Sequence, residues 1–475
     1  MTDTIAAIAT PLSDAGIGII RISGQDAVEV GDRLFTTPGG KHILKDVPSH
    51  TIHYGYLWEG QTKVDEVMVS VLRAPKSYTA EDTVEINCHG GLFVMQKILE
   101  LVCHNGARLA EPGEFTKRAF LNGRIDLSGA EAVMDLIHSQ NEIAMQSSID
   151  QLSGKLSQII RGLRENLIYE IAYIESALDD PEHFDLDGYS ADLSKIITEI
   201  EIKIKHLSES FYNGKMIKNG INTVILGKPN TGKSSLLNSL IGEDRSIVTD
   251  IEGTTRDTVH ESIRLKGIHL NLIDTAGIRN TSDAVEKIGV EKAKKYAAEA
   301  DLVIFVADTS RSLDENDREI LSLILDKHVI VLLNKTDLEA VIDEQQIYDV
   351  IETICTEKNR MYNIDTFKRN FVILKTSTKD GTGMKELEDA VVNLFLAGDI
   401  HQKDEVLITN LRHKQALQDA ENSLALVQQS IQDGMPEDFY TVDLMGAYRS
   451  LGLIIGEEVE DDLVEEIFSK FCMGK

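Results

Sequence analysis

The chain has 475 residues, of which 27% are charged and 42% hydrophobic, so it is long enough for about three domains with substantial cores. Its 48 basic and 78 acidic residues give a net charge of −30, which argues against broad, sequence-blind binding of nucleic acid but not against a local site. We expect neither a secretory signal nor a membrane span, because the first residues lack a basic segment followed by a hydrophobic core and no apolar stretch reaches about 18 residues. The four cysteines form no C-x-x-C pair, and we expect a cytoplasmic protein.

The first 120 residues alternate short apolar runs with turns. The apolar runs include residues 18–22, 67–72 and 83–86, and one helical pattern is interleaved at residues 94–102. Such a mixture predicts an α+β domain over residues 1–120.

The period of the apolar residues changes after about residue 130. Apolar residues recur every three or four positions from Ile149 to Ile174, which predicts one long amphipathic helix, and residues 179–181 (DDP) interrupt it. The helical pattern resumes over residues 193–207 and returns after Gly398. We predict one helical domain made of residues 121–216 and 398–475, whose two parts bury their apolar faces against each other; two separate helical hairpins are the alternative.

Residues 227–234 read GKPNTGKS and lie between an apolar run, residues 224–226, and a helical segment. This is the G-x-x-x-x-G-K-[ST] phosphate loop (P loop). Gly227 and Gly232 allow the tight turn that points backbone N–H groups at phosphate oxygens. Lys233 reaches the β- and γ-phosphates, and the Ser234 hydroxyl is a ligand for Mg²⁺. A chance match is the alternative, and the motifs that follow argue against it.

Three further nucleotide motifs each follow a strand-like run. Asp274 begins D-T-A-G, where the carboxylate can hold the Mg²⁺ shell and Gly277 can donate its N–H to the γ-phosphate. Asp337 ends N-K-T-D and would accept two hydrogen bonds from guanine, a donor pair that adenine lacks. Residues 377–379 (STK) would offer backbone N–H groups to guanine O6. The ordered set predicts an inserted P-loop GTPase domain of the Ras-like α/β kind over residues 217–397.

The segment between the first two motifs is typical of a GTPase switch. Residues 253–257 read GTTRD, and Thr255 would be a second hydroxyl ligand of Mg²⁺. Ile278 stands where Ras-type GTPases have a glutamine that orients the attacking water. Because an apolar side chain cannot orient water, we expect hydrolysis to need help from elsewhere, and Arg279 and Glu286 are nearby candidates.

Further distinctive motifs lie along the chain, at residues 4–11 (TIAAIATP), 16–24 (GIGIIRISG), 89–91 (HGG), 111–127 (EPGEFTKRAFLNGRIDL), 250–257 (DIEGTTRD) and 471–475 (FCMGK). With these motifs the chain resembles the MnmE (TrmE) family of tRNA modification GTPases over essentially its whole length. Other GTPases share only the central motifs, so the run from residue 111 and the Cys-x-Gly-Lys terminus are the specific ones.

The resemblance implies an enzyme that hydrolyses GTP and acts with a flavin-dependent MnmG-like protein in a heterotetramer. Together they would add a (carboxymethyl)aminomethyl group to carbon 5 of the wobble uridine of tRNA, using a one-carbon unit from a reduced folate such as 5-formyl- or methylene-tetrahydrofolate. It further implies Mg²⁺, K⁺-dependent hydrolysis activated when two GTPase domains meet, and a homodimer formed through a folate-binding-like N-terminal domain. A regulatory GTPase that modifies nothing is the alternative function.

The resemblance also assigns residues. The predicted folate-binding residues are Arg21, Glu85, Arg124 and Lys475. The predicted ligands of K⁺ are Asn230, Thr249, Ile251 and Thr254, and the predicted catalytic residues are Glu286, Lys233 and Cys472. The motifs and the resemblance together predict GTP contacts at Asn230, Thr231, Gly232, Lys233, Ser234, Ser235, Thr249, Thr254, Thr255, Asp274, Thr275, Ala276, Gly277, Asn334, Lys335, Asp337, Ser377, Thr378 and Lys379.

Overall fold

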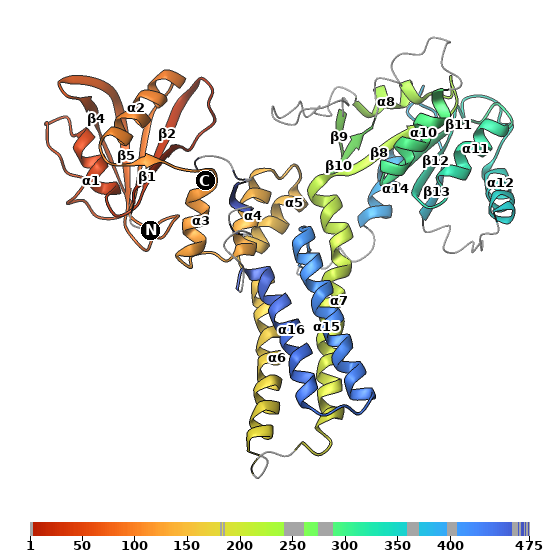
Figure 1. Cartoon of the computed structure of the whole chain (residues 1–475). Coiled ribbons are helices and arrows are strands. Elements are labelled where there is room, and N and C mark those ends of the chain that lie inside the picture. Colours follow the sequence, from red (N-terminus) through yellow and green to blue (C-terminus); the bar gives the residue numbers. More distant parts are fainter. Residues whose placement is uncertain are drawn as a thin grey trace. The chain divides into compact units, whose positions relative to one another are not determined.

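The computed structural model describes residues 3–180, 183, 186–241, 261–273, 288–358, 370–396, 406–457, 464, 467–469, 471 and 474. Its contacts divide the chain into two compact units (Figure 1). Unit 1 comprises Met1–His138, Ser148–Lys205 and Arg412–Lys475, and unit 2 comprises Ser139–Ser147 and His206–Leu411. The predicted three-domain division is finer than these units, and its boundaries stay predictions.

A seven-stranded sheet forms the N-terminal part of unit 1. Its order is β3 (Phe35–Thr36), β4 (Thr51–Glu59), β5 (Thr62–Leu72), β6 (Thr83–Gly90), β2 (Ala15–Ser23), β1 (Ile5–Ile8) and β7 (Arg108–Leu109). Neighbouring strands are antiparallel except β1 and β7. Helices α1 (Ala27–Leu34) and α2 (Leu92–His104) pack on one face, where Val69 and Ile86 join Ile98 in a hydrophobic core. The α+β prediction for this region is confirmed.

The opposite face of this sheet carries the alternate residues of the same strands, because side chains point to opposite faces in turn. Tyr54 pairs with Met68 across β4 and β5, and Arg21 pairs with Glu85 across β2 and β6. Ile52, Tyr54 and Met68 are 48–67% exposed, so this end of the face is not covered within the chain.

Helices build the rest of unit 1. They are α3 (Glu114–Leu121), α4 (Leu127–Ile137), the second half of α5 (Glu142–Leu152), α6 (Lys155–Asp179), the first half of α7 (Tyr189–Asn219), α15 (Leu411–Gln432) and α16 (Asp438–Ile455). Helix α16 packs on α6, and the Ser194 hydroxyl of α7 donates to Gln428 Oε1 of α15 at 2.7 Å. Helices before and after the nucleotide motifs therefore pack against each other.

One predicted helix is wrong in its extent. The segment from Ile149 to Ile174 is two helices, because α5 ends at Leu152 and α6 begins at Lys155. Gly154 between them has φ 87°, a left-handed conformation that a continuing helix cannot contain. The apolar spacing carries across the break, which is why the pattern suggested one continuous helix.

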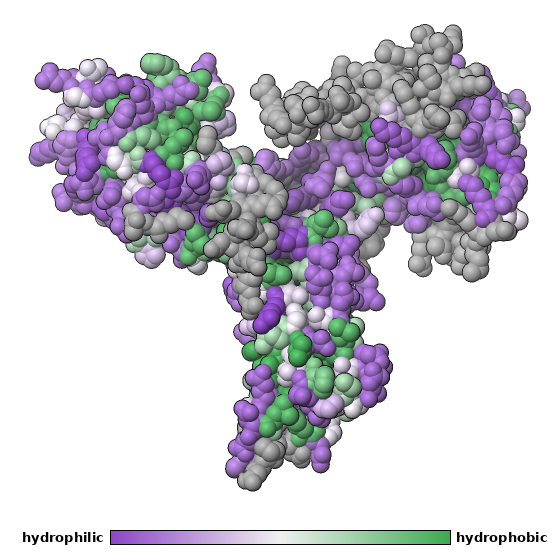
Figure 2. All heavy atoms as spheres, viewed as in Figure 1, coloured by the Kyte–Doolittle hydropathy of each residue, from purple (hydrophilic) through white to green (hydrophobic). Residues whose placement is uncertain are grey.

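Figure 2 shows hydrophobic residues interspersed with hydrophilic ones along the helices of this unit. No helix in the described part of the chain is both long and apolar enough to cross a membrane.

Unit 2 contains a six-stranded sheet between two helical layers. Its order is β13 (Phe371–Lys375), β12 (His328–Asn334), β11 (Leu302–Asp308), β8 (Ile221–Leu226), β10 (Ile268–Leu272) and β9 (Glu261–Leu265), and only β9 is antiparallel. Helices α8 (Lys233–Ile241) and α14 (Met384–Leu396) share one core with the sheet, and α10 (Ile288–Glu299), α11 (Glu315–Leu323) and α12 (Glu344–Glu357) share the other. After β8 the chain builds β9 and β10 on one side and β11 to β13 on the other. In such sheets, ligands bind beyond the carboxyl ends of the strands, at the point where the strand order changes direction. The P loop begins at this point, after β8.

Candidate functional site

The P loop connects β8 to α8 through a backbone that needs its glycines. Gly227 has φ 145° and Gly232 has φ 104°, conformations that residues with a side chain rarely adopt. A Cβ atom on Gly232 would lie 2.2 Å from the Asn334 amide nitrogen, so no larger residue fits without moving Asn334. Asn230 has φ 64°, a conformation that asparagine tolerates better than most residues.

Lys233 lies at the start of α8 with its ammonium turned back into the loop. Its Nζ donates to the carbonyl oxygens of Gly227 at 2.7 Å and Lys228 at 2.6 Å. No carboxylate in the described part of the chain pairs with Lys233, and burial lowers its pKa to about 8. A half-buried cation whose partners among the described residues are carbonyl oxygens fits an anionic ligand, and the N-terminus of α8 favours the same charge.

Asn334, the first residue of N-K-T-D, holds three segments together. Its amide Nδ2 donates to the carbonyl oxygen of Thr231 at 2.8 Å. Its Oδ1 accepts from the backbone N–H of Thr378 at 3.2 Å and from the hydroxyl of Thr376 at 3.4 Å. The end of β12 therefore ties the P loop to the segment after β13.

Asp337 and its neighbours lie beside Asn334 and the segment after β13. The Asp337 carboxylate accepts from the Ser377 hydroxyl at 3.3 Å, and Lys379 Nζ lies 3.7 Å from it on a side chain that is 82% exposed. Lys335 donates to Asp308 Oδ2 at 2.6 Å. Burial works against ionisation of Asp308, but Lys335 and Ser310 hold its pKa below the ordinary value. The sequence analysis did not name Asp308, although an acid at the carboxyl end of a buried strand was a usable signal.

The structure thus brings the P loop, N-K-T-D and residues 377–379 to one edge of the sheet. Ser234 and Ser235 lie in the first turn of α8. The remaining predicted residues of the nucleotide, cation and catalytic sets, and Lys475 of the folate set, lie outside the described residues: Thr249, Ile251, Thr254, Thr255, Asp274, Thr275, Ala276, Gly277, Glu286, Cys472 and Lys475. Among the described residues no group of three or more His, Cys, Asp or Glu side chains could hold a metal ion.

A second site lies on the face of the N-terminal sheet opposite α1 and α2. Arg21 Nε lies 2.9 Å from Glu85 Oε1, and Arg21 Nη1 donates to the carbonyl oxygen of Gly474 at 3.2 Å. Arg124 donates to the carbonyl oxygen of Tyr78 at 3.0 Å. The guanidinium carbons of Arg21 and Arg124 lie 5.5 and 5.0 Å from the centre of the Tyr78 ring. The predicted folate residues other than Lys475 therefore meet around Tyr78, which the sequence analysis missed.

The C-terminal segment reaches this second site across α3 and α4. Phe468 and Phe471 pack with Leu127 in a small hydrophobic cluster. A Cβ atom on Gly474 would lie 2.4 Å from the carbonyl oxygen of Ile8, and one on Gly113 would lie 2.5 Å from that of Phe468. These two glycines allow the close backbone approach that brings the end of the chain to Arg21.

Comparisons with known proteins match the whole chain. The family model described as GTP-binding protein TrmE N-terminus matches residues 4–124, and that of the MnmE helical domain matches residues 127–472. The tRNA modification GTPase MnmE of Lachnoclostridium phytofermentans is 54% identical over 477 residues, covering 100% of both chains. That of Acetivibrio thermocellus is 48% identical over 476 residues, covering 100% of this chain and 99% of its own. The solved G domain of the T. maritima FeoB iron transporter covers 37% of this chain and 98% of its own at 27% identity, but its TM-score of 0.25 is too low to bear on the fold.

Proposed function

Because the chain belongs to the MnmE family of tRNA modification GTPases, we propose that it binds and hydrolyses GTP and acts in tRNA modification in the cytoplasm. One observation carries the nucleotide part of this proposal. The half-buried Lys233 ammonium turns back into the P loop without a carboxylate partner among the described residues, and Asn334 joins that loop to the predicted guanine motif.

The residues of the P loop would bind the triphosphate. The backbone N–H groups of residues 230–234 would surround the β-phosphate, and Lys233 would leave its two carbonyl partners for phosphate oxygens. Ser234 and Thr255 would hold Mg²⁺, and Asn230 with Thr249, Ile251 and Thr254 would hold K⁺. Both cations would offset the negative charge that develops during phosphoryl transfer.

The remaining residues of this site would select guanine and orient water. Asp337 would accept the two donors of the guanine base, and the backbone N–H of Thr378 would approach guanine O6. Ile278 offers no polar group, so Glu286 would position the attacking water, most simply through a bridging water. A second copy of the chain would complete the site when two nucleotide domains meet.

The second site would bind a reduced folate. Glu85 would accept from the pterin edge, while Arg21, Arg124 and Lys475 would provide cations for its polar and carboxylate groups. Cys472 lies in the same C-terminal segment and would act on, or position, the one-carbon unit. With a flavin-dependent MnmG-like partner, the protein would install a (carboxymethyl)aminomethyl group on carbon 5 of the wobble uridine.

We also propose a homodimer and a three-domain organisation. The exposed apolar residues Ile52, Tyr54 and Met68 lie on the same face of the N-terminal sheet as Arg21 and Glu85, so a second copy could cover that face beside the folate site. The domains would be residues 1–120, residues 121–216 with 398–475, and an inserted GTPase domain of residues 217–397.

Measuring modified wobble uridine in tRNA from cells that lack the chain tests this function. We expect the modification to disappear and to return when the parent gene is supplied, but not when the Asp337→Asn variant is supplied. Normal modification in the deletion strain would refute the enzyme assignment and would leave the regulatory GTPase as the better description.

Calorimetry of the full-length protein with 5-formyltetrahydrofolate tests the second site. Arg21→Ala and Glu85→Ala should each cost about 1.5–3 kcal/mol of binding free energy, because each removes a charge-assisted bond. Arg33→Ala is the matched control, since Arg33 pairs only with the nearby Glu29 and Asn105 on the surface of the same sheet domain. If the folded parent binds no reduced folate, the one-carbon role is wrong.

A further inference from the structure

Tyr78 contacts Arg21 and Arg124, two of the predicted cations of the folate site. The guanidinium groups of Arg21 and Arg124 both lie within 6 Å of the centre of its ring, at a distance where the face of an aromatic ring attracts a cation. Its hydroxyl lies 2.8 Å from the hydroxyl of the buried Thr116, and its carbonyl oxygen accepts from Arg124 at 3.0 Å. Tyr78 thus contacts Arg124 through both its backbone and its ring.

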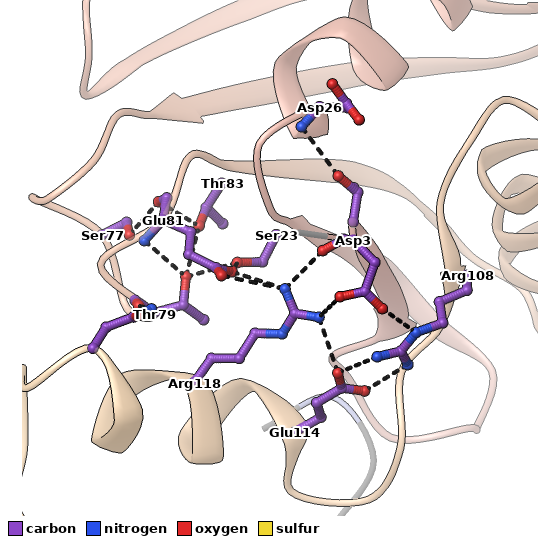
Figure 3. A network of polar contacts seen from close by, with 12 residues as sticks. Asp3, Ser23, Asp26, Ser77, Thr79, Glu81, Thr83, Arg108, Glu114 and Arg118 are labelled. Carbon is purple, nitrogen blue, oxygen red and sulfur yellow. Dashed lines mark hydrogen bonds and ion pairs between the residues drawn. The ribbon is translucent and has the colours of Figure 1, made fainter. Parts of the chain in front are cut away.

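A buried network holds the loop that carries Tyr78 (Figure 3). Arg118 of α3 is 1% exposed, and its Nη1 lies 3.2 Å from both carboxylate oxygens of Glu81. The Ser23 hydroxyl lies 2.6 Å from that of Thr79 and donates to Glu81 at 2.8 Å. These contacts hold the part of the loop that directly follows Tyr78.

The motif of residues 111–127 supplies most of the partners of this loop. Asn122 donates to the carbonyl oxygen of Thr79 at 2.7 Å, and Glu114 lies 3.0 Å from Arg118. Asp3 and Arg108 complete the network, with Asp3 accepting from both Arg118 at 2.9 Å and Arg108 at 2.5 Å. The polar residues of the motif therefore hold a loop in place.

Among the described charges of this region, Arg124 is a cation without an acidic partner. Within the network, Arg108 and Arg118 pair with the carboxylates of Asp3, Glu81 and Glu114, and Arg21 pairs with Glu85. Arg124 has no acidic partner in the part of the chain that the structure describes, and its side chain is exposed. An oriented, unpaired cation beside an arginine–glutamate pair fits a ligand that carries a carboxylate at one end.

We propose that Tyr78 is a positioning residue of the folate site, whose ring and carbonyl oxygen orient Arg124 to bind a carboxylate of the glutamate tail while Arg21 stays paired with Glu85. This inference rests on the folate site proposed above. A long exposed arginine loses side-chain freedom when it binds, and a side chain already held in its bound direction loses less. The ring also offers its negative face to two like charges, which lets both guanidinium groups lie nearby.

The test measures the Kd of 5-formyltetrahydrofolate for the full-length protein by calorimetry. Tyr78→Leu removes the ring and should raise Kd about tenfold, which is about 1.4 kcal/mol. Tyr78→Phe keeps the ring and loses only the contact with Thr116, so it should stay within about threefold of the parent. Tyr169→Leu on α6, where the tyrosine is 67% exposed, is the matched control and should bind like the parent.

Two further measurements separate positioning from a general loss of structure. If Tyr78 acts through Arg124, the double variant Tyr78→Leu/Arg124→Ala should bind 5-formyltetrahydrofolate no more weakly than Arg124→Ala alone. If the two residues act independently, the increases in Kd of the two single variants should multiply in the double variant. Tyr78→Leu should also leave the Kd of 5-formyltetrahydropteroate, which lacks the glutamate, within about twofold of the parent value. Circular dichroism and thermal unfolding show whether each variant is folded.

The outcomes distinguish this inference from the proposed function. A parent protein that binds reduced folate, with Tyr78→Leu at the parent Kd or with multiplying effects in the double variant, overturns the role of Tyr78 alone. A folded parent that binds no reduced folate overturns the folate site and this inference with it.

Discussion

Replacing Glu131 of α4 with glutamine should lower the free energy of unfolding of unit 1 by about 3–5 kcal/mol at neutral pH. The Glu131 carboxylate is buried and accepts two bonds from Arg412 of α15, from Nε at 3.0 Å and from Nη2 at 2.9 Å. His413 Nε2 lies 2.8 Å from the same carboxylate, and Arg412 also donates to the carbonyl oxygen of Ile454 near the end of α16 at 3.0 Å. Glutamine keeps the shape but removes the negative charge that Arg412 and His413 both meet.

The pKa of Glu131 gives a second estimate of how much its ionised carboxylate stabilises the folded state. Burial alone would raise this pKa, but His413 and Arg412 hold it at about 2, below its ordinary value of 4.5. A lowering of the pKa by this amount corresponds to about 3.4 kcal/mol of stabilisation of the folded state, at about 1.36 kcal/mol per pH unit. Because the folded-state pKa is the lower one, this stabilisation is fully present above pH 4.5 and is lost as the pH falls from 4.5 through about 2. At pH 3 about 2 kcal/mol of it should be gone.

Urea unfolding of the parent and Glu131→Gln at pH 7 and pH 3 measures both quantities. Circular dichroism follows the helices, and fluorescence of Trp58, the single tryptophan, follows the N-terminal sheet of the same unit. Glu165→Gln is the matched control, because Glu165 is an exposed residue of α6, and its effect should stay within about 0.5 kcal/mol. The parent and Glu131→Gln should differ in their free energy of unfolding. A difference below about 1 kcal/mol at pH 7, or one that does not shrink at pH 3, would refute the reasoning.

Three predictions concern the nucleotide site. GTP should be preferred over ATP by about 10⁴ or more, and Asp337→Asn should weaken GTP and favour xanthosine triphosphate; equal hydrolysis of ATP and GTP by the parent would contradict the assignment. Steady-state GTP hydrolysis should be fast in KCl and slow in NaCl at equal ionic strength. Asn230→Ala should abolish this difference, while Glu286→Ala should slow turnover and leave K⁺-driven association intact; equal parent rates in the two salts would exclude the K⁺ mechanism. Because burial holds the pKa of Lys233 at about 8 and phosphates bind its charged form, GTP affinity measured by calorimetry should fall about sixfold between pH 7 and pH 8.8, and an unchanged affinity would show that Lys233 does not meet the phosphates.

Features that depend on neighbouring residues could be predicted from the sequence. The P loop is a contiguous stretch whose conformation depends on Gly227 and Gly232, so its eight letters already imply the turn and the helix that follows. The strands before N-K-T-D and residues 377–379 were equally visible as apolar runs, and parallel strands in one sheet bring their carboxyl ends to the same edge. The same local reasoning failed at Gly154, because apolar spacing records which face is buried and not whether the backbone is continuous.

Contacts between distant residues were decided by the tertiary structure. Arg21 meets Glu85 only because the register of β2 and β6 places them opposite each other, and it meets Gly474 across 453 positions only because two glycines let the backbones approach. Tyr78 was not predicted, since an aromatic residue in a loop carries no signal of the arginines that fold around it. Composition and spacing determine conformation along the chain, whereas the direction in which Arg124 points depends on strand register and on the buried contacts that hold the loop of Tyr78.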